Sequence, residues 1–120
     1  ALTGKPVKLY GDGSELRDHL YIEDLVQIVR HFAQSDESGT YNLASGVSRT
    51  YQDLIAIIRT VVKKEFEVFH EDRTRPQVDQ TVNVSHLKQA VPGLNLTTLE
   101  QGIIETFRDM EQRLSEGTLH

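Results

Sequence analysis

The order of helix-like and strand-like stretches limits the possible folds of this chain more than any other feature of its sequence. Apolar side chains recur at helical spacing in residues 23–33, 50–64 and 97–114. These stretches alternate with short strand-like segments at residues 7–10, 40–44 and 66–70. The alternation predicts an α/β fold that combines a small sheet with about three main helices.

Capping patterns indicate where two of the helices begin. Thr50-x-x-Asp53 has the form of a capping box, in which side chains at the helix start bond the free backbone N–H groups. Thr97-x-x-Glu100 has the same form, so we expect the last helix to start there. Both patterns place negative charge in the first helical turn, where the helix dipole favours it.

Other local signals complete the predicted topology. Residues 11–14 have turn chemistry, and we expect residues 19–22 to pair back on residues 7–10 as a hairpin. A short helix is predicted at residues 85–90, and residues 115–120 read as a loose tail.

Composition restricts the classes of partner. The 120 residues fit one modest domain, and the net charge of −5 leaves no large basic surface for nucleic acid or an anionic membrane. The chain has no cysteine, and its first residues lack the apolar run of a signal peptide. No stretch approaches the roughly 20 apolar residues of a membrane-spanning helix. We therefore expect a soluble, cytoplasmic protein without nucleic-acid or membrane partners.

Phosphate recognition is the chemistry that the charge pattern suggests. Arg17, Arg73 and Arg75 lie in or beside turns, where a guanidinium group can bond two oxygens at once. The alternative is that Arg17 pairs with a neighbouring carboxylate such as Glu15 or Asp18, and that the other two arginines belong to a solvated loop. Residue type alone does not separate these readings.

Other candidate sites are weaker. Gly11-x-Gly13 has Leu16 where a dinucleotide fingerprint needs its third glycine, so a simple turn is predicted. Tyr10 and Tyr21 suit either a half-buried sheet or a flat contact to a nucleobase. The five histidines are scattered without metal-ligand spacing, and we predict no metal site.

A longer pattern resembles a known family. The string GKPVKLYGDGSELRDHLYIED at residues 4–24 is similar to a signature of extended short-chain dehydrogenase/reductases, in the NAD-dependent epimerase/dehydratase family that modifies nucleotide sugars. Segments similar to the rest of that family's C-terminal region follow in order at residues 39–46, 50–64, 75–76, 83–88 and 98–102. The resemblance implies that residues 1–120 form a single C-terminal substrate-binding portion that lacks the N-terminal Rossmann half.

The resemblance also implies a pyrophosphate site. In the family, the arginine that matches Arg17 and the arginine of an Arg-Pro loop hold the pyrophosphate of the nucleotide sugar. Arg75 precedes Pro76, but the spacing to Asn83 is shorter than usual, so Arg73 could be the equivalent arginine instead. The segment that lines the base matches Val7, Lys8 and Tyr10.

Cofactor and catalysis are expected elsewhere. The family's Gly-x-x-Gly-x-x-Gly fingerprint and Tyr-x-x-x-Lys pair are absent from this sequence. The resemblance therefore implies that NAD or NADP binds in the full-length parent enzyme, that this chain binds none, and that it carries no catalytic residue. The alternative is a non-catalytic binding or regulatory module with the same fold.

Isolation of this portion would have a structural consequence. Residues 22–46 are expected to pack on the Rossmann sheet, so without it they would leave an apolar face uncovered. We therefore expect a homo-oligomer or a dimer that exchanges elements between copies.

Overall fold

Each helix-like stretch of the sequence forms a helix. The computed structural model describes residues 5–36 and 38–117, within which four helices and two two-stranded sheets are present. The elements, in chain order, are β1 (Val7–Tyr10), β2 (Leu16–Asp18), α1 (Ile22–Ala33), β3 (Ser48–Thr50), α2 (Tyr51–Val62), β4 (Val68–Glu71), α3 (Ser85–Ala90) and α4 (Leu99–Ser115). The prediction of an α/β chain with about three main helices is confirmed, with α3 as the predicted short helix.

The capping box of α2 is present as predicted. Thr50 Oγ1 accepts a hydrogen bond from Asp53 N at 3.0 Å, and the Asp53 carboxylate faces Thr50 N at 3.5 Å. At the other end, Lys63 adopts the left-handed conformation that terminates many helices. The start of α4 differs from the prediction by one residue, because Thr98 rather than Thr97 caps it by accepting from Gln101 N.

The predicted hairpin between residues 7–10 and 19–22 is wrong. β1 pairs in parallel with β4, and β2 pairs in antiparallel fashion with β3. After the turn, long-range bonds direct the chain away from β1: Gly13 O accepts from Gln52 N, and Leu16 N donates to Asp79. A local pairing rule could not anticipate these partners.

The predicted strand at residues 40–44 is also wrong in this structure. The segment is irregular, since no neighbouring strand among the described residues supplies a ladder for it. Its burial was anticipated correctly at one end, because Ala44 lies in the main apolar cluster.

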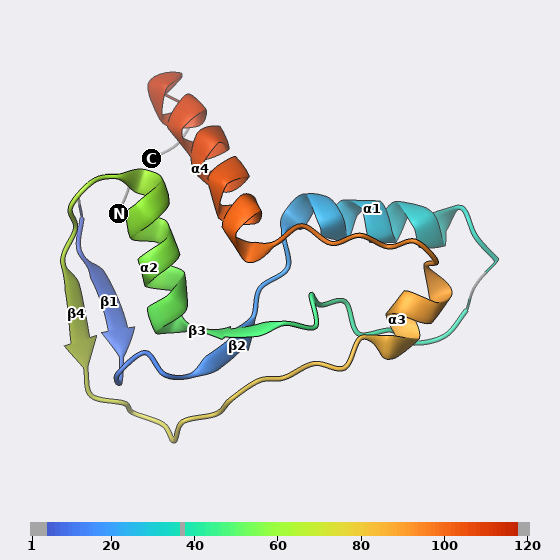
Figure 1. The fold of residues 1–120 in the computed structure, drawn as a ribbon, viewed down its shortest axis with the longest axis horizontal. Coiled ribbons are helices and arrows are strands. Elements are labelled where there is room, and N and C mark those ends of the chain that lie inside the picture. Colours follow the sequence, from blue (N-terminus) through green and yellow to red (C-terminus); the bar gives the residue numbers. More distant parts are fainter. Residues whose placement is uncertain (1–4, 37, 118–120) are drawn as a thin grey trace.

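The apolar interior is small and the chain is spread out. One cluster joins α1, α3 and the segments around them through Ile28, Ala44, Val84, Leu87 and Val91. In Figure 1 this region lies at one end, while β1, β4 and α2 lie at the other and α4 stands beside α2. The radius of gyration is 16.8 Å, whereas about 13–14 Å is expected for a compact domain of this length. No helix among the described residues has the length and apolarity to cross a bilayer.

One face of α1 is uncovered in this arrangement. Ile28 is buried, but Ile22, Val26 and Val29 are exposed at helical spacing. The packing of this face on a Rossmann sheet and the self-association of the chain both stay predictions. Of the predicted tail, residues 115–117 end α4 and form a turn, whereas residues 118–120 lie outside the described residues.

Two acidic side chains connect segments that are distant in sequence. Asp24, which is only 7% exposed, accepts hydrogen bonds from Thr97 N at 2.8 Å and Thr97 Oγ1 at 2.9 Å. Asp18 accepts from Ser45 N, Ser45 Oγ and Gly46 N, each at 2.8 Å. These carboxylates fix the approach to α4 and the turn before β3.

We expect Asp24→Ala to destabilise the chain by about 1–3 kcal/mol, because a half-buried backbone N–H at Thr97 would lose its acceptor. Urea unfolding of the two proteins measures the difference. Glu23→Ala, at the exposed neighbouring position of the same helical turn, serves as the control and should change stability by less than about 0.5 kcal/mol. Equal effects of the two substitutions would contradict the role given to Asp24.

We expect Gly46→Ala to destabilise more than Gly93→Ala. Both glycines have φ near +80°, at +81° and +78°, so both substitutions share a backbone cost of about 1 kcal/mol. A Cβ at Gly46 would lie 2.7 Å from Val84 Cγ2, whereas a Cβ at Gly93 meets nothing within 4 Å. The excess, about 1 kcal/mol or more, measures overpacking against the apolar cluster. Indistinguishable unfolding midpoints would argue against that contact.

Candidate functional site

Parallel pairing brings two loops to one edge of the sheet. β1 and β4 run in the same direction with Tyr10 opposite Glu71, so the segments that follow the two strands leave the sheet at the same edge. Gly11 N donates to Glu71 O at 2.7 Å, and His70 Nδ1 lies 2.8 Å from Gly11 O. These contacts hold the turn after β1 against the loop after β4.

Gly11 makes room for the side chain of Arg73. Its φ of +78° is in the left-handed region, and a Cβ on it would lie 2.3 Å from Arg73 Nε. The guanidinium group lies over this glycine, where Nη1 donates to Gln77 Oε1 at 2.7 Å and Nη2 donates to Asp12 Oδ1 at 3.2 Å. Gly11 therefore makes room for the guanidinium group of Arg73, and not for the pyrophosphate of a dinucleotide.

Arg17 approaches the same region from β2. Its Nη1 donates to Leu16 O at 2.8 Å and to Val78 O, and its Nη2 donates to Glu15 Oε2 at 2.9 Å. The guanidinium carbon also lies 5.8 Å from the centre of the Tyr51 ring, in cation–π range. Backbone carbonyls and one carboxylate thus fix the orientation of this arginine.

Glu15 connects the two arginines. Its Oε2 bonds Arg17, and its Oε1 lies 3.3 Å from Arg73 Nε. The Glu15 side chain is 15% exposed, so this contact is largely shielded from water. We call Asp12, Glu15, Arg17 and Arg73 the arginine cluster. The pairing of Arg17 with Glu15 was anticipated as an alternative, whereas the link to Arg73 was not, because no sequence pattern relates a turn to a loop so far away.

Hydrogen bonds lower the pKa values of two aspartates at the cluster, Asp12 and Asp79. Bonds from the Ser14 hydroxyl and backbone N–H lower the pKa of Asp12, and the charge of Arg73 adds to the effect. Asp79 accepts from Leu16 N and Gln77 Nε2, which lowers its pKa, with Arg17 and Arg73 contributing. The lowered pKa values of Asp12 and Asp79 favour their charged forms beside the two guanidinium groups.

The structure separates the remaining predicted residues from this cluster. Arg75 is exposed and makes no ion pair with the described residues. Tyr10 is 56% exposed at the end of β1, next to Gly11. Lys8 pairs with Glu71 at 3.3 Å along the sheet, and Val7 is half-buried at the start of the strand. Of the three predicted arginines, only Arg17 and Arg73 contact a common side chain, that of Glu15, within the described part of the chain.

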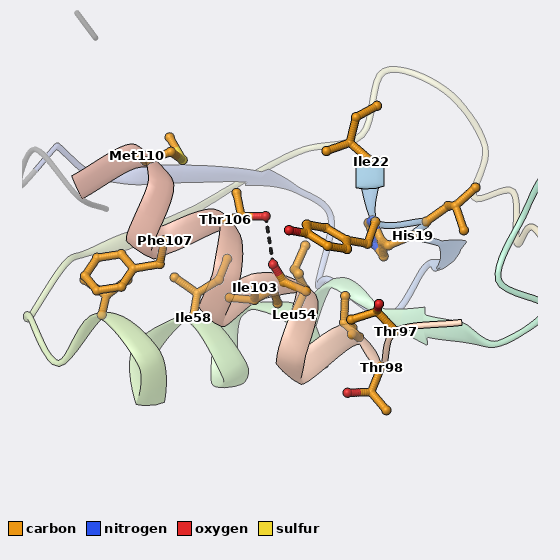
Figure 2. A pocket seen from close by; sticks show the side chains of 15 residues that line it. His19, Ile22, Leu54, Ile58, Thr97, Thr98, Ile103, Thr106, Phe107 and Met110 are labelled. Atoms are coloured by element: carbon orange, nitrogen blue, oxygen red, sulfur yellow. Dashed lines mark hydrogen bonds between the residues drawn. The ribbon is translucent and has the colours of Figure 1, made fainter. Parts of the chain in front are cut away.

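A second recess has a different character. An apolar groove of about 530 Å³ lies between α2, α4 and the segment after β2 (Figure 2). Side chains that include Leu54, Ile58, Ile103, Phe107 and Met110 line it. His19 lies at one end with a buried Nε2 that has no hydrogen-bond partner among the described residues. The groove has no carboxylate or guanidinium group, so it does not suit a charged diphosphate.

The turn at Gly11 and Gly13 differs from a dinucleotide-binding turn. Gly11 and Gly13 lie in a turn between two strands, so no helix N-terminus follows them to receive a pyrophosphate. Within residues 5–36 and 38–117, no group of three or more histidine or carboxylate side chains could hold a metal ion.

Comparison with known proteins agrees with this fold. The family model described as NAD dependent epimerase/dehydratase family matches residues 1–44. An ADP-L-glycero-D-manno-heptose-6-epimerase of Nitratidesulfovibrio vulgaris is 27% identical over 82% of this chain and 32% of its own length. A dTDP-glucose 4,6-dehydratase of Neisseria gonorrhoeae is 25% identical over 90% of this chain and 35% of its own length.

A solved epimerase structure is similar to this chain in fold. The UDP-N-acetylglucosamine 4-epimerase of Methanobrevibacter ruminantium M1, in complex with UDP-N-acetylmuramic acid, superposes with a TM-score of 0.82 at 27% identity. The match covers 93% of this chain and 36% of that one, so this chain spans about a third of the length of its relatives. The resemblance to the NAD-dependent epimerase/dehydratase family is thus supported by the family model over residues 1–44 and by the similarity of named epimerases and dehydratases over most of the chain.

Proposed function

We propose that this chain is the substrate-binding portion of an NAD(P)-dependent nucleotide-sugar epimerase or dehydratase. In this proposal Arg17 and Arg73 hold the pyrophosphate of the nucleotide sugar. The observation that carries the proposal is their convergence, from strand β2 and from a loop far away in sequence, on the two oxygens of one carboxylate at 2.9 and 3.3 Å. Phosphate oxygens are acceptors of the same kind, and two guanidinium forks suit them.

The named relatives support a diphosphate as the shared element of the ligand. Their names specify an ADP-heptose, dTDP-glucose and a UDP-amino sugar, which differ in base and sugar. A site that binds the diphosphate group would accept all three nucleotide sugars. The cluster consists of charged side chains with fixed orientation, whereas the apolar groove offers none.

Arg73 takes the role of second phosphate ligand in this proposal. Gly11 leaves the space for its guanidinium group, whereas Arg75 points to no partner within the described part of the chain. Tyr10, exposed beside Gly11, is proposed to face the base, with Val7 and Lys8 earlier on the same strand.

Catalysis and cofactor binding are assigned to the part of the relatives that this chain does not match. The bound pyrophosphate would fix the position of the sugar, so that binding energy contributes to orientation at the reacting carbon. NAD or NADP would supply the hydride chemistry in the complete enzyme.

Lysine substitutions test the pyrophosphate site. Arg17→Lys and Arg73→Lys keep the positive charge but lose the fork, and each should raise the Kd for UDP-glucose or dTDP-glucose by about tenfold or more. Isothermal titration of the full chain measures the Kd, and circular dichroism confirms that each variant keeps its fold.

Arg75→Lys is the matched control, because it makes the same change two residues further along the same loop. It should leave the Kd within about twofold of the wild-type value. A loss at Arg75→Lys equal to that at Arg73→Lys would reject the assignment of Arg73. If neither nucleotide sugar nor pyrophosphate binds the wild-type chain at millimolar concentration, the proposed function is wrong.

A further inference from the structure

Glu15 lies where the proposed function would place a phosphate. Its two carboxylate oxygens face Arg17 and Arg73 at 2.9 and 3.3 Å, so the chain supplies its own anion to the pair. We infer that Glu15 is an internal competitor: a diphosphate binds only by displacing this carboxylate from the two arginines. The inference rests on the proposed function and adds a residue that controls affinity at the same site.

Several donors of the two guanidinium groups already have partners other than Glu15. Both protons of Arg17 Nη1 are turned to the carbonyl oxygens of Leu16 and Val78. Arg73 uses Nη1 for Gln77 and Nη2 for Asp12. Arg17 Nη2 and Arg73 Nε are the donors that face the Glu15 carboxylate, so a phosphate that bonds both of these groups competes with Glu15.

One of these donors is poorly satisfied by Glu15. Arg73 Nε is buried and makes no hydrogen bond with the described residues, although Glu15 Oε1 is 3.3 Å away. A buried donor without an acceptor is costly. A tetrahedral phosphate has oxygens in more directions than a planar carboxylate, so it can bond this donor while also bonding Arg17.

Charge favours exchange over addition. Asp12, Glu15 and Asp79 already outnumber the two guanidinium groups. A diphosphate placed beside Glu15 would meet net negative charge, whereas one that replaces Glu15 removes a like charge from its own neighbourhood. The ligand therefore gains from the departure of the carboxylate.

The arginines are fixed independently of Glu15. Without it, Arg17 keeps its two backbone carbonyls and Arg73 keeps Gln77 and Asp12. Glu15 precedes β2, and within residues 5–36 and 38–117 its carboxylate contacts no charged or donor group other than these two arginines. The site can thus release Glu15 to solvent and stay organised for a ligand.

Glu15→Gln tests this inference with inorganic pyrophosphate as the probe. The amide keeps the shape of the side chain but lacks the charge. The full chain with this substitution should therefore bind pyrophosphate at least about tenfold more tightly than the wild type. Glu111→Gln, an exposed position on α4, makes the same change in net charge and should stay within about twofold of wild type.

A second measurement uses the wild-type chain, in case the variant does not fold. The ¹³C resonance of the Glu15 carboxyl group should shift as pyrophosphate is added, because the group leaves two guanidinium neighbours for water. A resonance that stays in place while pyrophosphate binds would overturn the inference.

The outcomes separate the inference from the function on which it rests. If the wild type binds pyrophosphate and Arg17→Lys weakens it, but Glu15→Gln binds no more tightly, the proposed function stands and the competitor role is wrong. If neither the wild type nor Glu15→Gln binds at millimolar concentration, both fail. Tighter binding of pyrophosphate by Glu15→Gln than by the wild type, together with near-wild-type affinity of Glu111→Gln, supports both the inference and the proposed function.

Discussion

The candidate site depends on the parallel pairing of β1 with β4. Because Tyr10 lies opposite Glu71, the turn after β1 and the loop after β4 start at the same edge of the sheet. Gly11 and Arg73 can then occupy the same small volume, with the glycine backbone directly beneath the guanidinium group. A shift of the register by one residue would turn every following side chain to the opposite face and separate these two residues.

Three buried or half-buried carboxylates join segments that are distant in sequence. Asp18 holds the turn before β3, Asp24 holds the segment before α4, and Glu15 joins β2 to the loop after β4. In a chain with a radius of gyration of 16.8 Å, apolar burial alone connects these segments weakly. Hydrogen bonds to ionised groups are stronger than neutral ones, so a few of them can fix loops that the small core does not reach.

Sequence reasoning recovered the elements whose causes are local. The helices α1, α2 and α4 follow from apolar periodicity within each segment, and capping side chains mark the starts of α2 and α4. The strand pairings failed because β1 finds its partner some sixty positions away in the chain, and no local pattern encodes that distance. The resemblance to a family pointed to Arg17 and to the loop of Arg73, but the choice of Arg73 over Arg75 needed coordinates, since it depends on the space above Gly11. Glu15 was anticipated as a possible partner of Arg17, but its contact with Arg73 was not.

The charge of the chain explains why the geometry of the cluster matters more than its sign. With a net charge of −5, the protein as a whole repels an anionic ligand, and the carboxylates around Arg17 and Arg73 exceed the guanidinium groups. Long-range attraction therefore contributes little to binding. Affinity for a diphosphate must come from short, directed bonds made at the moment of contact, and those bonds require that the two forks already point at one place. In the free protein, backbone carbonyls hold Arg17 and polar side chains hold Arg73, while the Glu15 carboxylate lies between the two guanidinium groups, where we propose that the diphosphate binds.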